Sequence, residues 1–397
     1  MGLIRSGIEA LEDSPIVEVW RMGYGDPGVV GMFAGESDVP TPGFIRDAAA
    51  GALAGGRTFY TPNRGIQPVR EALIEYNKRL YGIDLPDDRV TLTSSGMSAV
   101  MLIAQATVEP GDNAVAVTPS WPNILRAMQI CGAEPREVAM TAGNDGWSLD
   151  MGALFARCDA RTKVIYLASP GNPTGWMISR AQAEQLLEFA RARRIAIVSD
   201  EVYHRLVYEG PGSERGVAFS FLDIAHPADP VFVVNSFSKA WAMTGWRLGW
   251  IVYPEGHRVS FEKLIQFNSS GAPEFLQHGA IAALRHGEDF VKFFAGRCRG
   301  GRDLVNARLA RMPRVRNIPN TGGFYAMFEV AGVTDTLAFC KRAVLEAKIG
   351  MAPGIAFGRG SERFVRLCYA RSDEQLTMAM DRLESFVAGY RERAAGP

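Results

Sequence analysis

The sequence has few of the features that mark disulfide-rich, metal-binding or membrane proteins. Its five cysteines are far apart and never form a C-x-x-C pair, so neither a disulfide framework nor a zinc knuckle is indicated. The five histidines have no ligand spacing, and we expect no metal site. The longest uncharged run, residues 90–108, is interrupted by Ser, Thr, Gln and Gly, so we expect no membrane span.

Net charge is absent as well. The 43 Lys and Arg residues balance 43 Asp and Glu residues, so no overall positive field would draw the chain to nucleic acid or to an acidic membrane surface. The first residues lack the apolar segment of a signal peptide, and with the cysteine usage this predicts a cytoplasmic protein. Hydrophobic residues make up 47% of the chain and charged residues 22%, which is typical of folded proteins.

Short β-rich runs alternate with helical patterns from residue 90 onward. Residues 96–107 and 179–193 are predicted helices, and the second opens with the capping box Ser179-x-x-Gln182. This alternation predicts an α/β core. The predicted strands are 90–93, 114–117, 163–168, 195–199, 231–235 and 248–252.

The end of the chain has a different pattern, and its length of 397 residues suggests two or three domains. Three successive helices are followed by a strand at 324–330 and a final helix at 373–392. This order predicts a smaller α+β unit and a domain boundary near 290–300. The three helices are predicted at 257–268, 274–286 and 288–311.

Polar residues that could carry chemistry follow several of the apolar strands. Lys239 comes shortly after the strand at 231–235, with Ser236 three residues before it and Arg247 eight residues after it. Asn172 and Asp200 each follow another predicted strand. Because ligands of open α/β sheets bind at the carboxyl edge, these side chains are predicted to meet in one site.

With these motifs the sequence resembles the class I and II aminotransferases, the fold-type I enzymes that depend on pyridoxal 5′-phosphate. The resemblance runs from about Gly35 to Tyr369. It implies a large domain with a mostly parallel seven-stranded sheet flanked by helices, residues 46–295, and a smaller α+β domain, residues 296–397. The N-terminal segment 1–45 would pack with the small domain. A homodimer with shared active sites is implied as well.

The resemblance also implies roles for the residues that would handle the cofactor ring. Lys239 resembles the lysine that forms the internal aldimine, and Asp200 the carboxylate that keeps the pyridine nitrogen protonated. Tyr203 and Asn172 resemble the donors to the phenolic oxygen, and Trp121 the aromatic residue stacked on the ring. Lys239, Asp200 and Tyr203 would be the catalytic residues.

Further matches concern the phosphate and the substrate. The phosphate cup is implied to consist of the backbone at 95–97, the side chains of Ser236 and Arg247, and a tyrosine from the neighbouring subunit. Arg366 resembles the arginine that holds the substrate carboxylate, with Gly35, Trp121 and Asn172 lining the same site. The residues implied at the phosphate are Ser95, Gly96, Met97, Ser236, Arg247 and, from the partner, Tyr60.

Each role has a physical reason. A carboxylate such as Asp200 stabilises a pyridinium, and the cationic ring is the stronger electron sink. An amine nucleophile must be unprotonated near pH 7, so Lys239 needs a lowered pKa, which burial and a nearby cation such as Arg247 would supply. A helix N-terminus and a guanidinium group both bind a phosphate dianion favourably, and Gly96 is the first residue of the predicted helix 96–107.

The sequence departs from the family where substrate side chains are selected. Some relatives that take acidic amino acids have a lysine where this chain has Met97, and the segment 267–273 carries no charge. This favours a substrate with a neutral or polar side chain, although Arg64 could swing into the site.

Three functions remain open from the motifs. The first is an aminotransferase that moves an amino group from an L-amino acid to a 2-oxo acid. The second is another reaction on the same scaffold, such as a C–S β-lyase, a decarboxylase or a cyclopropane-forming synthase. The third is a non-enzymatic regulator that binds the cofactor. Such regulators carry a DNA-binding domain ahead of the family-like segment, and we expect no room for one before Gly35.

Overall fold

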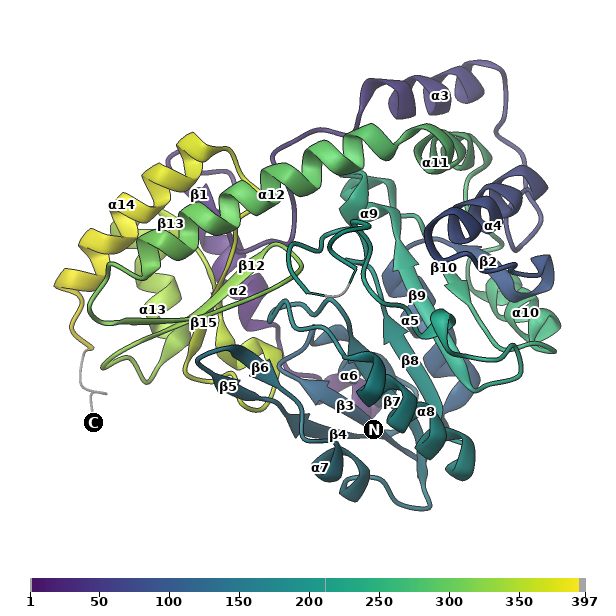
Figure 1. Ribbon diagram of the computed structural model, residues 1–397, viewed down its shortest axis with the longest axis horizontal. Helices are drawn as coiled ribbons and strands as arrows, with labels where there is room; N and C mark the ends of the chain where they lie inside the picture. The colour runs from purple at the N-terminus through teal and green to yellow at the C-terminus, as the bar shows by residue number, and fades with distance from the viewer. Residues whose placement is uncertain (1, 211, 393–397) are drawn as a thin grey trace.

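The computed structural model describes residues 2–210 and 212–392, and Figure 1 shows their arrangement. Within these residues the largest sheet has seven strands in the order β2-β10-β9-β8-β7-β3-β4. Strand β10 is antiparallel to both of its neighbours, and the other pairs are parallel. The prediction of a mostly parallel seven-stranded sheet is therefore confirmed. Its strands are β2 (Val90–Thr93), β3 (Asn113–Thr118), β4 (Glu134–Ala139), β7 (Thr162–Ala168), β8 (Ala196–Asp200), β9 (Val231–Ser236) and β10 (Gly249–Val252).

Helices cover both faces of this sheet. Helices α4 (Gln67–Tyr81), α8 (Arg180–Arg193) and α11 (Glu274–His286) pack on one face, and α5 (Gly96–Thr107), α6 (Asn123–Ile130) and α10 (Arg258–Asn268) on the other. Side chains alternate between the two cores: Val115 and Val117 belong to the first, Ala114 and Ala116 to the second. Because both faces are covered, the central strands are continuous apolar runs, and this made them predictable.

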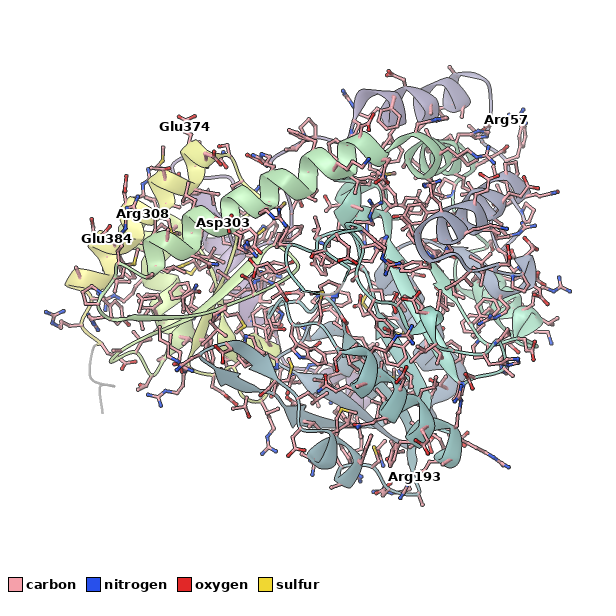
Figure 2. All side chains as sticks on the ribbon, viewed as in Figure 1. Arg57, Arg193, Asp303, Arg308, Glu374 and Glu384 are labelled. Carbon is pink, nitrogen blue, oxygen red and sulfur yellow. The ribbon has the colours of Figure 1, made fainter. Side chains whose placement is uncertain are left out.

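A second, smaller sheet has a core of its own. Its strands β11 (Val315–Ile318), β12 (Tyr325–Val330), β15 (Phe364–Cys368) and β14 (Ala352–Pro353) are joined in antiparallel pairs. Helices α2 (Pro15–Gly23), α12 (Glu288–Leu309), α13 (Thr336–Arg342) and α14 (Asp373–Gly389) contribute to this core. On the outside, Arg308 of α12 forms ion pairs with Asp381 and Glu384 of α14. Figure 2 labels Arg308 and Glu384 on these neighbouring helices.

The N-terminal segment and α12 link the two parts of the molecule. Strand β1 (Val30–Gly31) pairs in parallel with β13 (Ile349–Gly350), and Val19 of α2 lies in the core of the smaller unit. Helix α12 runs without interruption through residue 295, from one part to the other (Figure 1). The division into 1–45, 46–295 and 296–397 stays a prediction, with its last boundary inside this helix.

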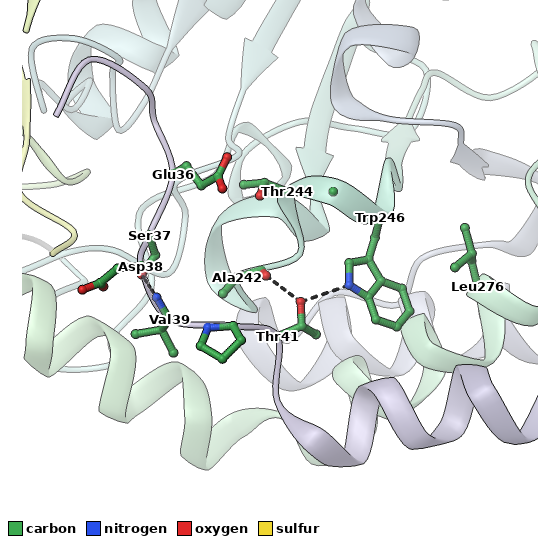
Figure 3. Close-up of a pocket in the computed structure, with 11 residues that line it drawn as sticks. Glu36, Ser37, Asp38, Val39, Thr41, Ala242, Thr244, Trp246 and Leu276 are labelled. Carbon is green, nitrogen blue, oxygen red and sulfur yellow. Dashed lines mark hydrogen bonds between the residues drawn. The ribbon is translucent and has the colours of Figure 1, made fainter. Parts of the chain in front are cut away.

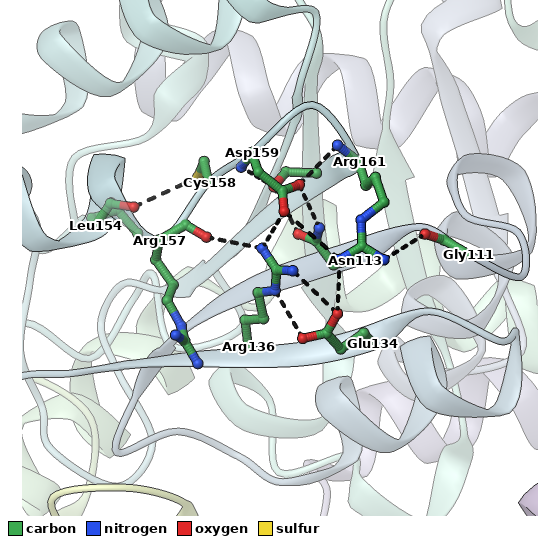
Figure 4. A network of polar contacts seen from close by, with 10 residues as sticks. Gly111, Asn113, Glu134, Arg136, Leu154, Arg157, Cys158, Asp159 and Arg161 are labelled. Carbon is green, nitrogen blue, oxygen red and sulfur yellow. Dashed lines mark hydrogen bonds and ion pairs between the residues drawn. The ribbon is translucent and has the colours of Figure 1, made fainter.

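Strand β4 is the one strand of the large sheet that the sequence pattern did not predict. It forms the edge of the sheet and has three charged residues among its six, as exposed edge strands often do. Its Arg136 forms ion pairs with Glu134 at 3.0 Å and with Asp159 at 2.8 Å (Figure 4). The pair with Asp159 joins β4 to the loop before β7 and so connects the edge strand to the rest of the sheet.

The described residues also bear on the expectations for membrane spans and metal sites. Among the described residues no helix has both the length and the apolar character to cross a membrane. In the same residues there is no group of three or more His, Cys, Asp or Glu side chains that could hold a metal ion.

The remaining elements are short or peripheral. They are α1 (Ser6–Glu9), α3 (Gly43–Ala54), α7 (Met151–Ala156), α9 (Phe237–Ala240), β5 (Thr141–Gly143) and β6 (Gly146–Ser148).

Candidate active site

A cavity of about 630 Å³ lies at the carboxyl ends of the strands of the large sheet, beside the smaller sheet. It is lined by side chains from positions 16 to 366 of the chain. Most of the residues singled out in the sequence line it together: Gly35, Gly96, Met97, Trp121, Asn172, Asp200, Tyr203, Ser236, Lys239, Arg247 and Arg366.

Two predicted residues do not line this cavity. Ser95 is buried directly before it and caps α5, because its Oγ accepts a hydrogen bond from the amide of Ser98 at 2.8 Å. Tyr60 is 95% exposed and lies outside the cavity. Its predicted role requires a second chain, so that role stays a prediction.

Lys239 is a buried amine at the centre of this arrangement. It lies on α9, the short turn that follows β9, and its Nζ donates to the carbonyl oxygen of Gly35 at 2.6 Å. Burial lowers the pKa of Lys239 to about 8, and the positive charges of Arg366 and Arg247 act in the same direction. Near neutral pH a far larger fraction of this amine is therefore unprotonated than for an ordinary lysine, and the unprotonated form acts as a nucleophile or base.

Asp200 is buried at the end of β8 and faces the same cavity. Its Oδ2 accepts a hydrogen bond from Tyr166 at 2.9 Å, and its Oδ1 accepts one from the amide of Val202 at 3.2 Å. Burial is the main cause that raises the pKa of this carboxyl group. A cationic N–H group bound in the cavity would oppose this effect, because it would stabilise the charged carboxylate of Asp200.

Tyr166 was missed by the sequence analysis. It lies on β7, where Ala168 pairs with Asp200 and Tyr166 pairs with Val198 two residues earlier. In a parallel pair these positions share one face of the sheet. Pairing the two predicted strands in this register would have placed Tyr166 beside Asp200.

Arg366 lies on β15 and is 3% exposed. One guanidinium nitrogen donates to Oδ1 of Asn172 at 3.1 Å and another to the carbonyl oxygen of Phe33. Its Nε has no hydrogen-bond partner, and no carboxylate pairs with Arg366 in the part of the chain that the structure describes. A buried guanidinium is costly unless an anion neutralises it, so this position suits a carboxylate ligand.

The N-terminus of α5 and two serines meet at one corner of the cavity, where the chemistry suits an anion. The first amides of an α-helix lack partners within the helix, and the helix dipole favours negative charge there. A Cβ atom at Gly96 would be only 3.3 Å from Cβ of Ser236, so the backbone approaches the serine closely. Ser238, which the sequence analysis did not select, lines the cavity and donates its amide to Oγ of Ser236 at 3.1 Å.

A second hollow of about 560 Å³ continues from this cavity and shares Glu36, Thr244 and Gly245 with it. In Figure 3 the N-terminal segment crosses the loop after α9. Thr41 donates to the carbonyl oxygen of Ala242 at 2.7 Å and accepts from Nε1 of Trp246 at 3.0 Å. These bonds attach the segment that carries Gly35 to the loop that carries Arg247.

The large mixed sheet with a buried lysine at its carboxyl edge has the architecture of the aminotransferase fold. The family described as aminotransferase class I and II matches residues 27–383. The chain belongs to this family, and it is an enzyme, a transaminase.

Relatives with curated names resemble the chain over nearly its whole length. An aspartate aminotransferase of Pyrococcus horikoshii is 31% identical and an aromatic-amino-acid aminotransferase of Thermococcus litoralis 30% identical. The alignments cover 96% and 95% of this chain, respectively, and 96% of each relative. The solved aspartate aminotransferase of Thermus thermophilus with maleate has a TM-score of 0.88 and 29% identity, over 97% of this chain and all of that one.

A solved alanine aminotransferase of Pyrococcus furiosus matches with a TM-score of 0.90 and 25% identity, over 98% of this chain and 100% of that one. The amino acids in these names differ from relative to relative. The comparisons therefore establish the reaction, transfer of an amino group between an amino acid and an oxo acid, and leave the amino acid to the chemistry of the cavity.

Proposed function

We propose that this chain is a pyridoxal 5′-phosphate-dependent aminotransferase that moves the amino group of an L-amino acid to a 2-oxo acid at the cavity around Lys239. The observation that carries the proposal is that Lys239, Asp200 and Arg366 line one cavity. They provide an amine of lowered pKa, a buried carboxylate and a buried guanidinium. These are the groups required by an aldehyde, a pyridinium and a substrate carboxylate, respectively.

The cavity fits the cofactor. Asp200 would pair with the ring nitrogen, held in place by Tyr166, and Trp121 would flank the ring. Asn172 and Tyr203 would donate to the phenolic oxygen. When bound, the pyridinium ring supplies an electron sink for the α-carbon of the amino acid. The phosphate would be held by the N-terminus of α5 together with Ser236, Ser238 and Arg247.

Lys239 would both bind the cofactor and move the substrate proton. With a pKa of about 8, its Nζ is a base of suitable strength near neutral pH. In this role Nζ would take a proton from the α-carbon of the amino acid and deliver it to C4′ of the cofactor, and it would move a proton in the opposite direction when the oxo acid is converted. Arg366 would bind the α-carboxylate with two parallel hydrogen bonds and so hold the α-carbon within reach of Nζ.

The cavity favours a substrate with a neutral or polar side chain. Its cationic lining residues in the described chain are Lys239, Arg247 and Arg366, each with a role above, and Met97 is uncharged. Arg64 is 5% exposed and forms ion pairs with Asp87 and Glu262. Because these contacts hold Arg64, it would not neutralise a distal carboxylate.

We also propose a homodimer with shared active sites. Phe59, Tyr60 and Phe267 are 79%, 95% and 83% exposed, a large apolar area for a single chain. Thr61 donates to the carbonyl oxygen of Ala272 at 3.3 Å, so the segment with Phe59 and Tyr60 lies beside the one that follows Phe267. A second copy would cover this surface and receive Tyr60 at its phosphate.

We also propose the cytoplasm as the location of the protein. The five free cysteines agree with this reducing compartment.

The test is a spectral titration of the purified holoenzyme with a panel of amino acids. Without a 2-oxo acid, an active amino acid should convert the cofactor stoichiometrically to its amine form. Adding the oxo acid should restore the original spectrum and permit continuous turnover. Turnover that continues without any oxo acid would indicate a lyase, and an unchanged spectrum with every amino acid would contradict the proposal.

A further inference from the structure

Tyr325 makes an unusual contact with Tyr203. Their hydroxyl oxygens are 2.6 Å apart, and both side chains are buried. Tyr203 follows β8 of the large sheet, whereas Tyr325 begins β12 of the small sheet, opposite Cys368 of β15. The contact therefore joins the two halves of the cavity, and Tyr325 itself lines it.

The short distance restricts where the two protons point. Each hydroxyl has one proton, and only one of the two can lie between the oxygens. Tyr325 has no other side-chain acceptor among the hydrogen bonds of the described residues. When Tyr325 donates, Tyr203 accepts, and the proton of Tyr203 is free to point into the cavity. When Tyr203 donates instead, it has no proton for a ligand.

The ring of Tyr325 has a second contact. The guanidinium carbon of Arg366 lies 4.4 Å from its centroid, within the range of a cation–π interaction. This face also restricts the rotation of the guanidinium plane. A Cβ atom at Gly35 would overlap the hydroxyl of Tyr325, so the tyrosine lies directly against the segment that binds Lys239.

We propose that Tyr325 is a positioning residue for both the cofactor and the amino-acid substrate. Its hydroxyl donates to Tyr203 and turns the proton of Tyr203 toward the cofactor's phenolic oxygen, and its ring orients Arg366 for the substrate carboxylate. The inference rests on the proposed function, in which Tyr203 donates to that oxygen. A hydroxyl that accepts a hydrogen bond is also a better donor, so the pair acts as a polarised chain.

Two substitutions separate the parts of this role. Tyr325→Phe removes the hydroxyl and keeps the ring under Arg366, whereas Tyr325→Leu removes both. Tyr369→Phe is the matched control: Tyr369 is equally buried, and its hydroxyl accepts from Asn320 at 2.8 Å, but it does not line the cavity. All variants are compared as holoenzymes, by the pH titration of the cofactor absorbance and by steady-state kinetics.

Tyr325→Phe should raise the apparent pKa of the cofactor absorbance, because the phenolic oxygen loses part of the donor that stabilises its anion. It should lower kcat about threefold to tenfold and leave KM for the amino acid within about twofold, since the ring remains. Tyr325→Leu should in addition raise KM about threefold to thirtyfold, the range of a lost cation–π contact. Tyr369→Phe should change neither the absorbance pKa nor KM.

The decisive comparison is a double-mutant cycle with Tyr203→Phe. If Tyr325 acts through Tyr203, the double variant should have the same absorbance pKa as Tyr203→Phe alone. Additive shifts, or a Tyr325→Phe protein with lowered melting temperature but an unchanged absorbance pKa, would overturn the positioning role. A wild-type protein that forms no cofactor absorbance band would instead refute the proposed function on which the inference rests.

Discussion

The Nζ of Lys239 donates to the carbonyl oxygen of Gly35 at 2.6 Å, across more than half of the chain. A Cβ atom at Gly35 would lie 3.5 Å from this Nζ and would overlap the hydroxyl of Tyr325. The N-terminal segment therefore passes between the lysine and the small sheet, and at this point it has space only for glycine. This N-terminal segment therefore forms one wall of the cavity.

The first prediction concerns attachment of the cofactor. Borohydride reduction of the holoenzyme followed by peptide mapping should place the pyridoxyl group on Lys239. Lys239→Ala should still bind the cofactor through the phosphate site and should lose about 10²- to 10⁴-fold in transamination rate, the usual contribution of a general base. A pyridoxyl group on any other lysine would contradict the site assignment.

The second prediction concerns the substrate carboxylate. Arg366→Ala should lower kcat/KM about tenfold to a hundredfold, since a hydrogen bond to a charged group contributes about 1.5 to 3 kcal/mol. The loss should be similar for every accepted amino acid, because all share the α-carboxylate. Arg366→Lys should recover the activity only in part, since an ammonium group cannot form the planar pair of hydrogen bonds. Unchanged kinetics in Arg366→Ala would exclude the role.

How far the site could be predicted depended on where its residues lie in the chain. Lys239, Asp200 and Asn172 each follow a buried apolar strand, so local pattern and family motif identified them together. Ser238 lies between Ser236 and Lys239 and shares this signal, although it was not selected, whereas Tyr325 carries no such signal. Tyr325 reaches the cavity only because the small sheet packs against the loop after β8, and that packing is a tertiary relationship with no local signature.

The same limit applies to the fold. The buried strands were predicted within one or two residues because both of their faces are apolar. Strand β4 was missed because its Glu134 and Arg136 serve an exposed edge, where charge replaces the apolar pattern. Helix α12 was predicted as one helix over 288–311, but its periodicity did not show that it contributes to both cores.

The third prediction links Lys239 to the stability of the cofactor-free protein. Burial lowers the pKa of Lys239 to about 8 in the folded chain, against about 10.5 for an ordinary lysine. Between these pH values the unfolded chain binds more protons at this group, so its contribution to the free energy of unfolding rises with pH. Below pH 8 both states are protonated, and the buried charge costs about 3 kcal/mol.

Lys239→Met removes this cost and keeps most of the side-chain volume. In denaturant unfolding the variant should be more stable than the cofactor-free wild type at pH 7, and the difference should shrink as the pH rises toward 10.5. A difference that is constant from pH 7 to 10.5 would show that folding does not shift the pKa of Lys239, since the folded and unfolded chains would then bind the same number of protons at this group.

The fourth prediction concerns substrate selection at Met97. This residue lines the cavity at the first turn of α5, where a lysine side chain could extend into the same space. Met97→Lys should raise kcat/KM for aspartate relative to alanine about tenfold or more, because a distal carboxylate would gain a charge-assisted hydrogen bond. Met97→Gln is the neutral control. A wild-type enzyme that already prefers aspartate to neutral amino acids would contradict the proposed selectivity.

The fifth prediction tests the shared active site. Chains with Lys239→Ala are mixed with chains with Tyr60→Ala under conditions that allow subunit exchange. If Tyr60 reaches the partner's cavity, each hybrid dimer has one intact site and one site with both defects. Random pairing makes about half of the dimers hybrids, so about one quarter of all sites should recover activity.

The matched control for this exchange is Lys239→Ala mixed with Arg366→Ala. Both residues line one cavity within a single chain, so each hybrid site keeps one of the two defects and activity should stay at the level of the unmixed variants. Recovery in this control would mean that Arg366 is the shared residue. No recovery with Tyr60→Ala would mean that Tyr60 serves its own chain or no site at all. A protein that sediments as a monomer at assay concentration would exclude sharing altogether, since an isologous site needs both copies.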